Sequence, residues 1–282
     1  MPNSISLVQQ AETDRRVYAL AREYLLALDV PGLTREMIES YGKPLDPARC
    51  STLAQIYLRF LTSAQNANMK AGVVGRAIKG VENLAIVLCD FDPAAVIDKY
   101  DTDADRLLED IVRQLQPNGE IRRTRRSIWP QYCRSALSGA WFFAQFGSSD
   151  AFYEWADSFN RQDEWCAALP LLLDKEVRGL GFALACDFLK ELGYVNFAKP
   201  DVHLSDIFKK LSLCDSSADD YGVFKAIIRV ARHCGAPPYE VDKMFWLTGS
   251  GYFYNHTAIG NEGRINLDRQ KCIDFVRSRI II

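Results

Sequence analysis

The chain lacks several features that would place it in a class at once. Its 34 basic and 36 acidic residues leave a net charge of −2, so overall charge gives no argument for a nucleic-acid partner. No apolar stretch is long enough to span a bilayer, and the first residues, Met-Pro-Asn-Ser-Ile, lack a basic segment followed by an apolar one. We therefore expect a soluble, intracellular protein with no membrane partner.

The cysteines lack the close spacing of a metal cluster. Eight are present, at positions 50, 89, 133, 166, 186, 214, 234 and 272, and no two form a Cys-x-x-Cys pair. Most lie within apolar helical patterns, such as Leu88-Cys89 and Ala185-Cys186. This is typical of buried, reduced thiols in a reducing compartment. No metal-ligand spacing joins the histidines, so we expect no metal site.

Runs that alternate every second residue are scarce, and no repeat or low-complexity tract is visible. Apolar residues recur at helical spacing over residues 17–27, 53–61 and 185–192. Proline and glycine separate such segments, for example at Pro31-Gly32 and Pro117-Asn118-Gly119. The sequence predicts an all-α protein, with about ten or more helices packed as an orthogonal bundle.

The most informative segment is residues 175–208, which begins with a glycine turn. Gly179-Leu180-Gly181 follows an apolar run and precedes a helical pattern from Ala183 onward. A Gly-x-Gly turn that opens a helix leaves backbone N–H groups exposed, and such groups suit a phosphate. The alternative is an ordinary tight turn between two helices.

A carboxylate follows this turn at a distance of twenty residues. Asp201 stands directly after Pro200 and before the helical pattern of residues 202–208. As a helix N-cap it would accept hydrogen bonds from free N–H groups. It could also stabilise the positive charge that develops on a sugar as its base leaves. We expect the helix N-terminus to lower the pKa of Asp201 and keep it ionised at neutral pH.

With this turn and carboxylate, residues 175–208 resemble the helix-hairpin-helix (HhH-GPD) DNA glycosylase superfamily, and most closely its 8-oxoguanine DNA glycosylase-like members. The resemblance implies two helical lobes that flank a DNA cleft, with the hairpin motif, about residues 170–192, at its edge. It implies a glycosylase domain over residues 46–282, and an N-terminal helical extension over residues 1–45.

The resemblance also implies DNA contacts. Gly179 and Gly181 would offer amides to a phosphate beside Arg178, and the hairpin carbonyls of this superfamily often hold a monovalent cation. His203 has a counterpart that approaches a phosphate, although a partly exposed histidine at a helix start is the alternative. Some members hold an iron–sulfur cluster on four closely spaced C-terminal cysteines. This chain offers three distant ones there, so we expect no cluster.

A second stretch, residues 60–70, is similar to the Ser-x-Asn-Asn-Asn segment of the same members. There, asparagines fill the gap that an extruded nucleotide leaves, and base excision needs such a plug. The resemblance assigns this role to Gln65, Asn66 and Asn68, with Ala67 interrupting the run. The alternative is a polar connection between helices, with its amides in water.

Charge and chain order suggest further contacts. Arg122-Arg123-Thr124-Arg125-Arg126 is the densest basic run, from which we name Arg122 and Arg123 as DNA-backbone contacts. The alternative is a solvated charged face. The aromatic stretch after it, residues 127–135, is expected in the core. By order alone, the resemblance implies base-pocket positions for three residues: Asp187, Asp242 and Trp246. Acidic groups there would favour a base with an exocyclic amino group, whereas Trp246 has the alternative of a core position.

One residue of the superfamily is missing. Members that also cut the DNA backbone carry a lysine two residues past the second glycine, as the nucleophile that forms a Schiff base. Here that position is Ala183. The resemblance therefore implies a monofunctional enzyme without lyase activity, in which Asp201 activates a water molecule.

The resemblance thus implies a DNA glycosylase of base-excision repair, which we expect to be a monomer in the cytoplasm with the nucleoid or in the nucleus. It would flip a damaged or modified base from double-stranded DNA and hydrolyse the N-glycosidic bond, without an organic cofactor. Two alternatives stay open. One is a DNA-binding protein that keeps the hairpin without turnover, and the other is a helical interaction protein with no DNA role.

Overall fold

The structure is a computed structural model that describes residues 6–44, 49–67, 72–160, 166–253, 263–265 and 267–280. The chain divides into two compact units. The first, here called the terminal unit, comprises residues 1–46 and 195–282, and the second, the central unit, comprises residues 47–194.

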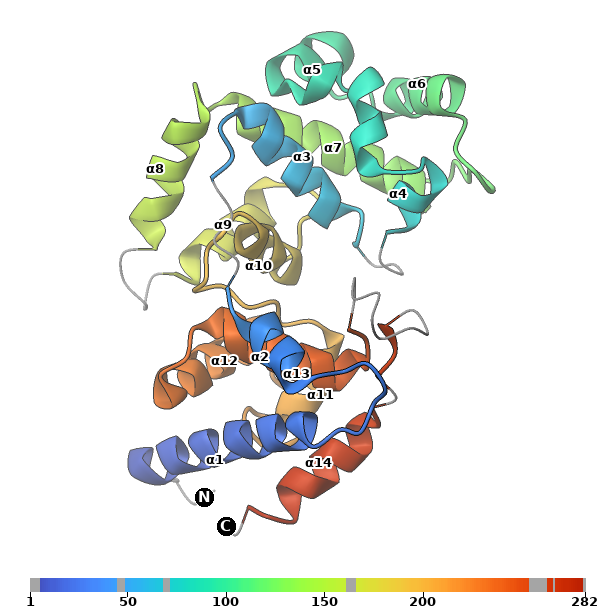
Figure 1. The fold of residues 1–282 in the computed structure, drawn as a ribbon. Helices are drawn as coiled ribbons and strands as arrows, with labels where there is room; N and C mark the ends of the chain where they lie inside the picture. Colours follow the sequence, from blue (N-terminus) through green and yellow to red (C-terminus); the bar gives the residue numbers. More distant parts are fainter. Residues whose placement is uncertain are drawn as a thin grey trace. The chain divides into compact units, whose positions relative to one another are not determined.

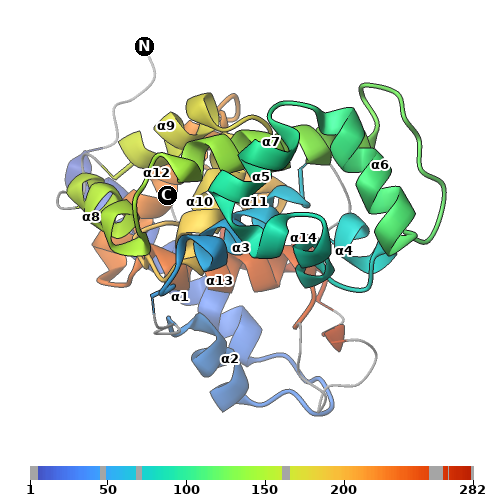
Figure 2. The ribbon, with the colours of Figure 1, turned by 90° about the horizontal axis from the view of Figure 1, so that it is seen from above.

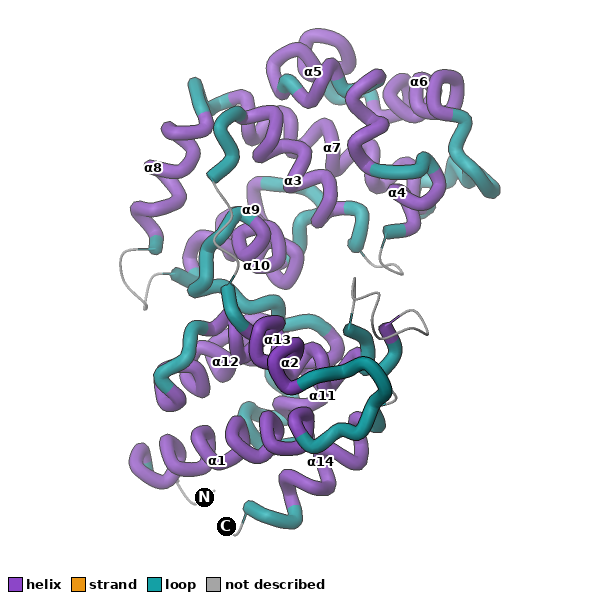
Figure 3. Tube along the Cα trace, viewed as in Figure 1, coloured by secondary structure: helices purple, strands orange, loops and turns teal. Residues whose placement is uncertain are grey.

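Every regular element in the described part of the chain is a helix, and no strand occurs there (Figure 3). In the described residues, Tyr252 and Arg264 form an isolated antiparallel β-bridge. The prediction of an all-α protein is therefore confirmed. Among the described helices, none combines the length and the apolar character needed to cross a membrane.

The terminal unit is built from helices of both chain ends (Figure 1). Its helices are α1 (Leu7–Leu26), α2 (Arg35–Gly42), α11 (Val202–Lys210), α12 (Asp220–Cys234), α13 (Pro238–Ser250) and α14 (Arg269–Arg277). Val17, Ala21 and Leu25 form a buried stripe on α1 at four-residue spacing. With this face α1 packs against α12, α13 and α14. The sequence prediction set residues 1–45 apart as an extension, whereas the structure groups them with residues 195–282.

A buried carboxylate fastens α1 to α12. Asp14 is fully buried and accepts hydrogen bonds from Arg229, at 2.8 Å from Nε and 3.1 Å from Nη2. Nδ1 of His233 lies 2.6 Å from the same carboxylate, and Gln10 donates to it at 2.9 Å. A buried charge is tolerated only where such partners replace its hydration. This cluster therefore ties the N-terminal helix to the rest of the terminal unit.

The central unit is also helical (Figures 1 and 2). Its elements are α3 (Leu53–Ala64), α4 (Val73–Ala77), η1 (Val81–Ile86), η2 (Cys89–Phe91), α5 (Pro93–Tyr100), α6 (Ala104–Leu115), α7 (Ile128–Ala144), α8 (Ser149–Phe159), α9 (Ala168–Glu176) and α10 (Phe182–Glu191). Helix α7 packs against α3, α5 and α6, and Figure 2 shows it alongside α5.

Aromatic residues fill the core around α7. Trp129 and Tyr132 are 5% and 3% exposed, which confirms the core position predicted for this aromatic stretch. Gly139 lies against the ring of Phe60, and a Cβ there would collide with that ring. Helices α3 and α7 therefore approach closely at this point, and α7 becomes a rigid support for the elements that pack on it.

Candidate functional site

A tight turn joins α9 to α10, in the segment where the hairpin motif of about residues 170–192 was expected. Gly179 has a φ of +82°, and a Cβ on it would collide with Oγ of Ser135 on α7. Both its backbone conformation and this close approach require glycine. The N–H of Arg178 donates to Oγ of Ser138, also on α7, at 2.9 Å. Helix α7 thus fixes the shape of the turn.

Gly181 has no comparable reason to be glycine. Its φ of −61° and ψ of 162° suit any residue, and a Cβ on it would meet no atom within 4 Å. It is the exposed N-cap of α10, and no side chain caps this helix end. A glycine whose missing side chain leaves open space at a helix N-terminus is suited to the close approach of an anion.

A pocket of about 570 Å³ adjoins the turn. It is lined by Arg125, Arg126, Gln131, Arg134, Ser135, Arg178 and Gly179. Burial and the positive charges of Arg178 and Arg125 lower the pKa of the Arg134 guanidinium. Repulsion between the arginines therefore adds to the effect of burial, and no carboxylate belongs to the lining. We call these four arginines and Gly179 the hairpin pocket.

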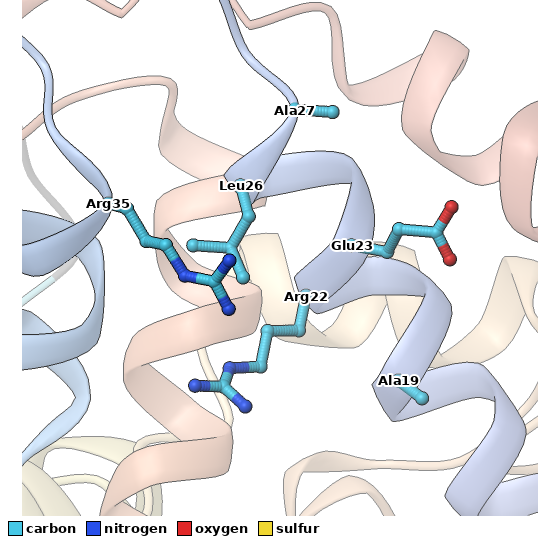
Figure 4. Close-up of a pocket in the computed structure, with 6 residues that line it drawn as sticks. All are labelled: Ala19, Arg22, Glu23, Leu26, Ala27 and Arg35. Carbon is cyan, nitrogen blue, oxygen red and sulfur yellow. The ribbon is translucent and has the colours of Figure 1, made fainter.

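A pocket in the terminal unit is lined by two arginines that form ion pairs with a carboxylate. It measures about 440 Å³ and is lined by Ala19, Arg22, Glu23, Leu26, Ala27 and Arg35. In Figure 4, Arg22 and Arg35 start from opposite sides and extend toward the region between them, whereas Glu23 points away from it. Both arginines pair with Glu39, at 3.2 Å and 3.1 Å. Their charge is therefore already offset within the protein.

A third pocket, of about 640 Å³, lies in the central unit, and carboxylates accompany its arginines too. Its lining includes Arg49 and Glu82, and Arg49 pairs with Asp157 at 3.0 Å. Of these three pockets, the hairpin pocket is the one whose lining holds arginines without a carboxylate. Its electrostatic character is that of a site for an anion.

The predicted contacts Arg122 and Arg123 are exposed residues before α7. Arg122 pairs with Glu120 at 3.1 Å. The lining of the hairpin pocket contains neither of them, and instead contains Arg125 and Arg126 from the same basic run. The sequence analysis took the four arginines of this run as a candidate DNA-backbone contact and singled out Arg122 and Arg123, whereas it gave Arg134 no role. The basic run in the sequence pointed to Arg125 and Arg126, whereas Arg134 belongs to the pocket because the glycine turn packs on α7.

The amides after α3 are engaged within the central unit. Gln65 is 8% exposed, and its Oε1 accepts a hydrogen bond from the N–H of Gly75 at 2.9 Å. Oδ1 of Asn66 accepts from the N–H of Gly72, also at 2.9 Å. Both side chains therefore hold the connection to α4 through hydrogen bonds to backbone N–H groups, and the amide of buried Gln65 does not lie in water as the alternative expected. Asn68 lies outside the described residues, and the DNA role of all three amides stays a prediction.

Asp201 is the N-cap of α11. Its Oδ1 accepts hydrogen bonds from the N–H groups of His203, at 2.9 Å, and Leu204, at 3.1 Å. Burial nevertheless raises the pKa of the carboxyl group. The Leu204 hydrogen bond opposes this effect, and the negative charge of Asp242 adds to it. The expectation that the helix N-terminus would lower this pKa is therefore wrong, because desolvation outweighs the cap.

Three other predicted residues surround Asp201 in the terminal unit. Asp242 on α13 is 1% exposed, and its Oδ2 accepts from the N–H of Lys199 at 3.2 Å. The ring of His203 lies edge-on to partly exposed Trp246, with 6.3 Å between ring centroids. Buried Nδ1 of His203 has no hydrogen-bond partner among the described residues. The fold thus brings together two carboxylates, a histidine and a tryptophan.

Asp187 lies on α10 in the central unit. It forms an ion pair with Lys190 over 3.5 Å, and the side chains are only 14% and 7% exposed. The sequence analysis did not assign this lysine a role. Its spacing of three residues from Asp187 was the available signal, since such residues share one face of a helix.

Within the described ranges, no three His, Cys, Asp or Glu side chains gather to hold a metal ion. Burial raises the pKa of Cys133 and of Cys272 to about 12, so both are protonated thiols at neutral pH. Comparison of the chain with known protein families, with curated proteins and with solved structures gives no match. The interpretation therefore depends on the geometry of the site.

The raised pKa of Asp201 has a consequence for stability. Since the folded pKa lies above the unfolded one, folding favours the protonated carboxyl group. The resulting stabilisation of the folded state is complete below the pKa of Asp201 in the unfolded chain. It is lost as the pH rises through the pKa of Asp201 in the folded protein. At neutral pH the ionised group therefore costs stability, despite its cap.

We expect Asp201→Asn to have an equal or higher free energy of unfolding at pH 7, because asparagine keeps the cap and removes the buried charge. The gain should disappear as the pH falls below about 4. Urea denaturation followed by circular dichroism measures both values. Asp219→Asn is the matched control, because Asp219 caps α12 from an exposed position and should give no such gain. A less stable Asp201→Asn protein at pH 7 would contradict the analysis.

Proposed function

We propose that the chain is a monofunctional DNA glycosylase of the helix-hairpin-helix superfamily, which removes a damaged or modified base from double-stranded DNA. The observation that carries the proposal is the hairpin pocket, in which four arginines without a carboxylate adjoin a glycine turn. The two-lobed arrangement of that superfamily, with its hairpin motif at a cleft, belongs to this proposal.

A DNA phosphate fits the chemistry of the turn. Arginine guanidinium groups donate paired hydrogen bonds to phosphate oxygens, and the open N-terminus of α10 offers backbone N–H groups. The empty space beside Gly181 lets a phosphodiester approach the backbone. Contacts of this kind position a duplex and carry no sequence information, so recognition of the target depends on the flipped base.

Asp201 supplies the chemistry. As the bond between the sugar C1′ and the base nitrogen breaks, its electron pair leaves with the base, and positive charge develops on the sugar. The carboxylate stabilises this charge and accepts the proton of a water molecule whose oxygen bonds to C1′. The cap uses Oδ1 of Asp201 and sets the orientation of the group. Ala183 at the Schiff-base position agrees with hydrolysis by water.

The remaining assignments follow from the same proposal. Asp187 and Trp246 would contribute to the base pocket, and His203 would approach a phosphate. The protein would act as a monomer in the cytoplasm or nucleus. The alternative, a DNA-binding protein without turnover, shares the hairpin pocket and differs in giving Asp201 only a capping role.

Gly181→Ala is expected to weaken duplex binding by on the order of tenfold, because a methyl group would block a charged hydrogen bond to phosphate. Its stability should stay unchanged, since the new Cβ meets no protein atom. Gly179→Ala should instead lower the free energy of unfolding through its positive φ and its collision with Ser135. Fluorescence anisotropy and urea denaturation separate the two effects. Wild-type affinity in Gly181→Ala would argue against phosphate binding at the turn.

Arg134→Gln is expected to reduce the salt dependence of duplex binding by about one unit in the slope of log K against log salt concentration. Arg35→Gln is the control, because its charge is paired with Glu39 in a different pocket and should leave the slope unchanged. Titrations at several salt concentrations give both slopes. Equal slopes for the two variants would mean that the hairpin pocket does not bind the DNA backbone.

Asp201→Asn is expected to lose base excision by about a hundredfold or more, because the sugar cation loses its stabilising charge, while duplex affinity is kept. A panel of oligonucleotides with different modified bases, treated with hot alkali, reveals the abasic sites formed. Asp219→Asn should excise as the wild type does. No excision by the wild type on any substrate would favour the binding protein, and strand cleavage without alkali would contradict hydrolysis by water.

A further inference from the structure

The segment that carries Asp201 is held by α13 at two points. The N–H of Lys199 donates to Oδ2 of Asp242 at 3.2 Å, and the N–H of Tyr239 donates to the carbonyl oxygen of Val195 at 3.0 Å. Tyr239 and Asp242 lie one helical turn apart. Within the segment, the N–H of Asp201 donates to the carbonyl oxygen of Lys199 at 2.8 Å. A chain of hydrogen bonds therefore runs from α13 to the candidate catalytic residue.

The charge of Asp242 is not explained by this anchoring role. An asparagine at that position could accept the same N–H through its amide oxygen. Burying a carboxylate to 1% exposure is costly unless its partners replace its hydration, and a second carboxylate nearby adds repulsion. A buried carboxylate beside a second carboxylate is an arrangement that sites tuning an acid or a base often contain.

Asp242 also has almost no surface to offer a substrate. Its 1% exposure argues against the base-pocket contact expected from its place in the chain. Half-buried Asp201 retains the access that a reacting group needs. The two carboxylates thus have different roles, one at the surface of the site and one behind it.

We propose that Asp242 is a positioning residue, which fixes the Lys199–Asp201 turn and makes Asp201 a stronger acceptor for the proton of the attacking water. The inference rests on the proposed function. Asp242 itself touches neither the substrate nor the water. It acts through the hydrogen bond to Lys199 and through the repulsion between the two negative charges, which is relieved when Asp201 takes the proton.

Several charges act on Asp201 in the terminal unit. Asp242 on α13 raises the pKa of its carboxyl group, whereas His203 on α11 and Lys199 in the preceding turn lower it. Asp220 on α12 is close enough for Asp201 to raise its pKa in turn. Removing the charge of Asp242 leaves the two positive groups in place, so the pKa of Asp201 should fall.

The test compares Asp242→Asn, which keeps an acceptor for Lys199, with Asp242→Ala, which removes it. In Asp242→Asn, the acid limb of the pH profile of single-turnover excision should move to lower pH, and the rate on the plateau should fall about tenfold. Asp242→Ala should fall further and show faster hydrogen exchange of the Lys199 amide. Duplex affinity should match the wild type in both, with Asp219→Asn as the control. An unmoved acid limb, or a change in substrate preference alone, would overturn the proposal.

A measurement without DNA separates this inference from the proposed function. Carbon-13 NMR titration of the Asp201 carboxyl group should give a lower pKa in Asp242→Asn than in the wild type. If the pKa of Asp201 is lower in Asp242→Asn but the wild type excises no base, the proposed function fails. The effect of the Asp242 charge on Asp201 is then supported all the same. If the wild type excises and the titration is unmoved, Asp242 is not a positioning residue and the glycosylase proposal survives.

Discussion

The candidate site depends on the balance between burial and capping at Asp201. Two backbone N–H groups of α11 stabilise its charge, while desolvation and the neighbouring Asp242 oppose that charge. The net effect is a raised pKa of the carboxyl group. A carboxylate in this state is a better proton acceptor than a solvated one, which is the property that activation of water requires. The fold tolerates the cost because α13 holds the adjoining turn.

The hairpin pocket depends on a second close contact, between Gly179 and Ser135. Because the turn lies directly on α7, it brings Arg178 beside Arg134 of that helix. Their charges add, and no lining carboxylate offsets them. In the other two pockets, Arg22, Arg35 and Arg49 form ion pairs with carboxylates of the protein. This difference, rather than the number of arginines, makes the hairpin pocket the candidate for a phosphate.

Local features were predictable because they depend on neighbours in the chain. The helical periodicity, the glycine turn before α10 and the N-cap at Asp201 each involve contacts within a few residues. The core position of the aromatic stretch near Trp129 followed from its apolar pattern. The assignments taken from the family resemblance stay proposals, since they concern DNA and its chemistry.

By itself, then, the sequence determined the helical character, the turn and the position of the cap. Only the tertiary structure decided that Asp201 has a raised pKa, that Arg134 joins the hairpin pocket and that Gln65 binds Gly75. It also decided that residues 1–46 belong with residues 195–282. The physical reason is common to all four. Burial and electrostatic interaction depend on distances between groups that lie far apart in the chain, and these distances exist only after the helices have packed.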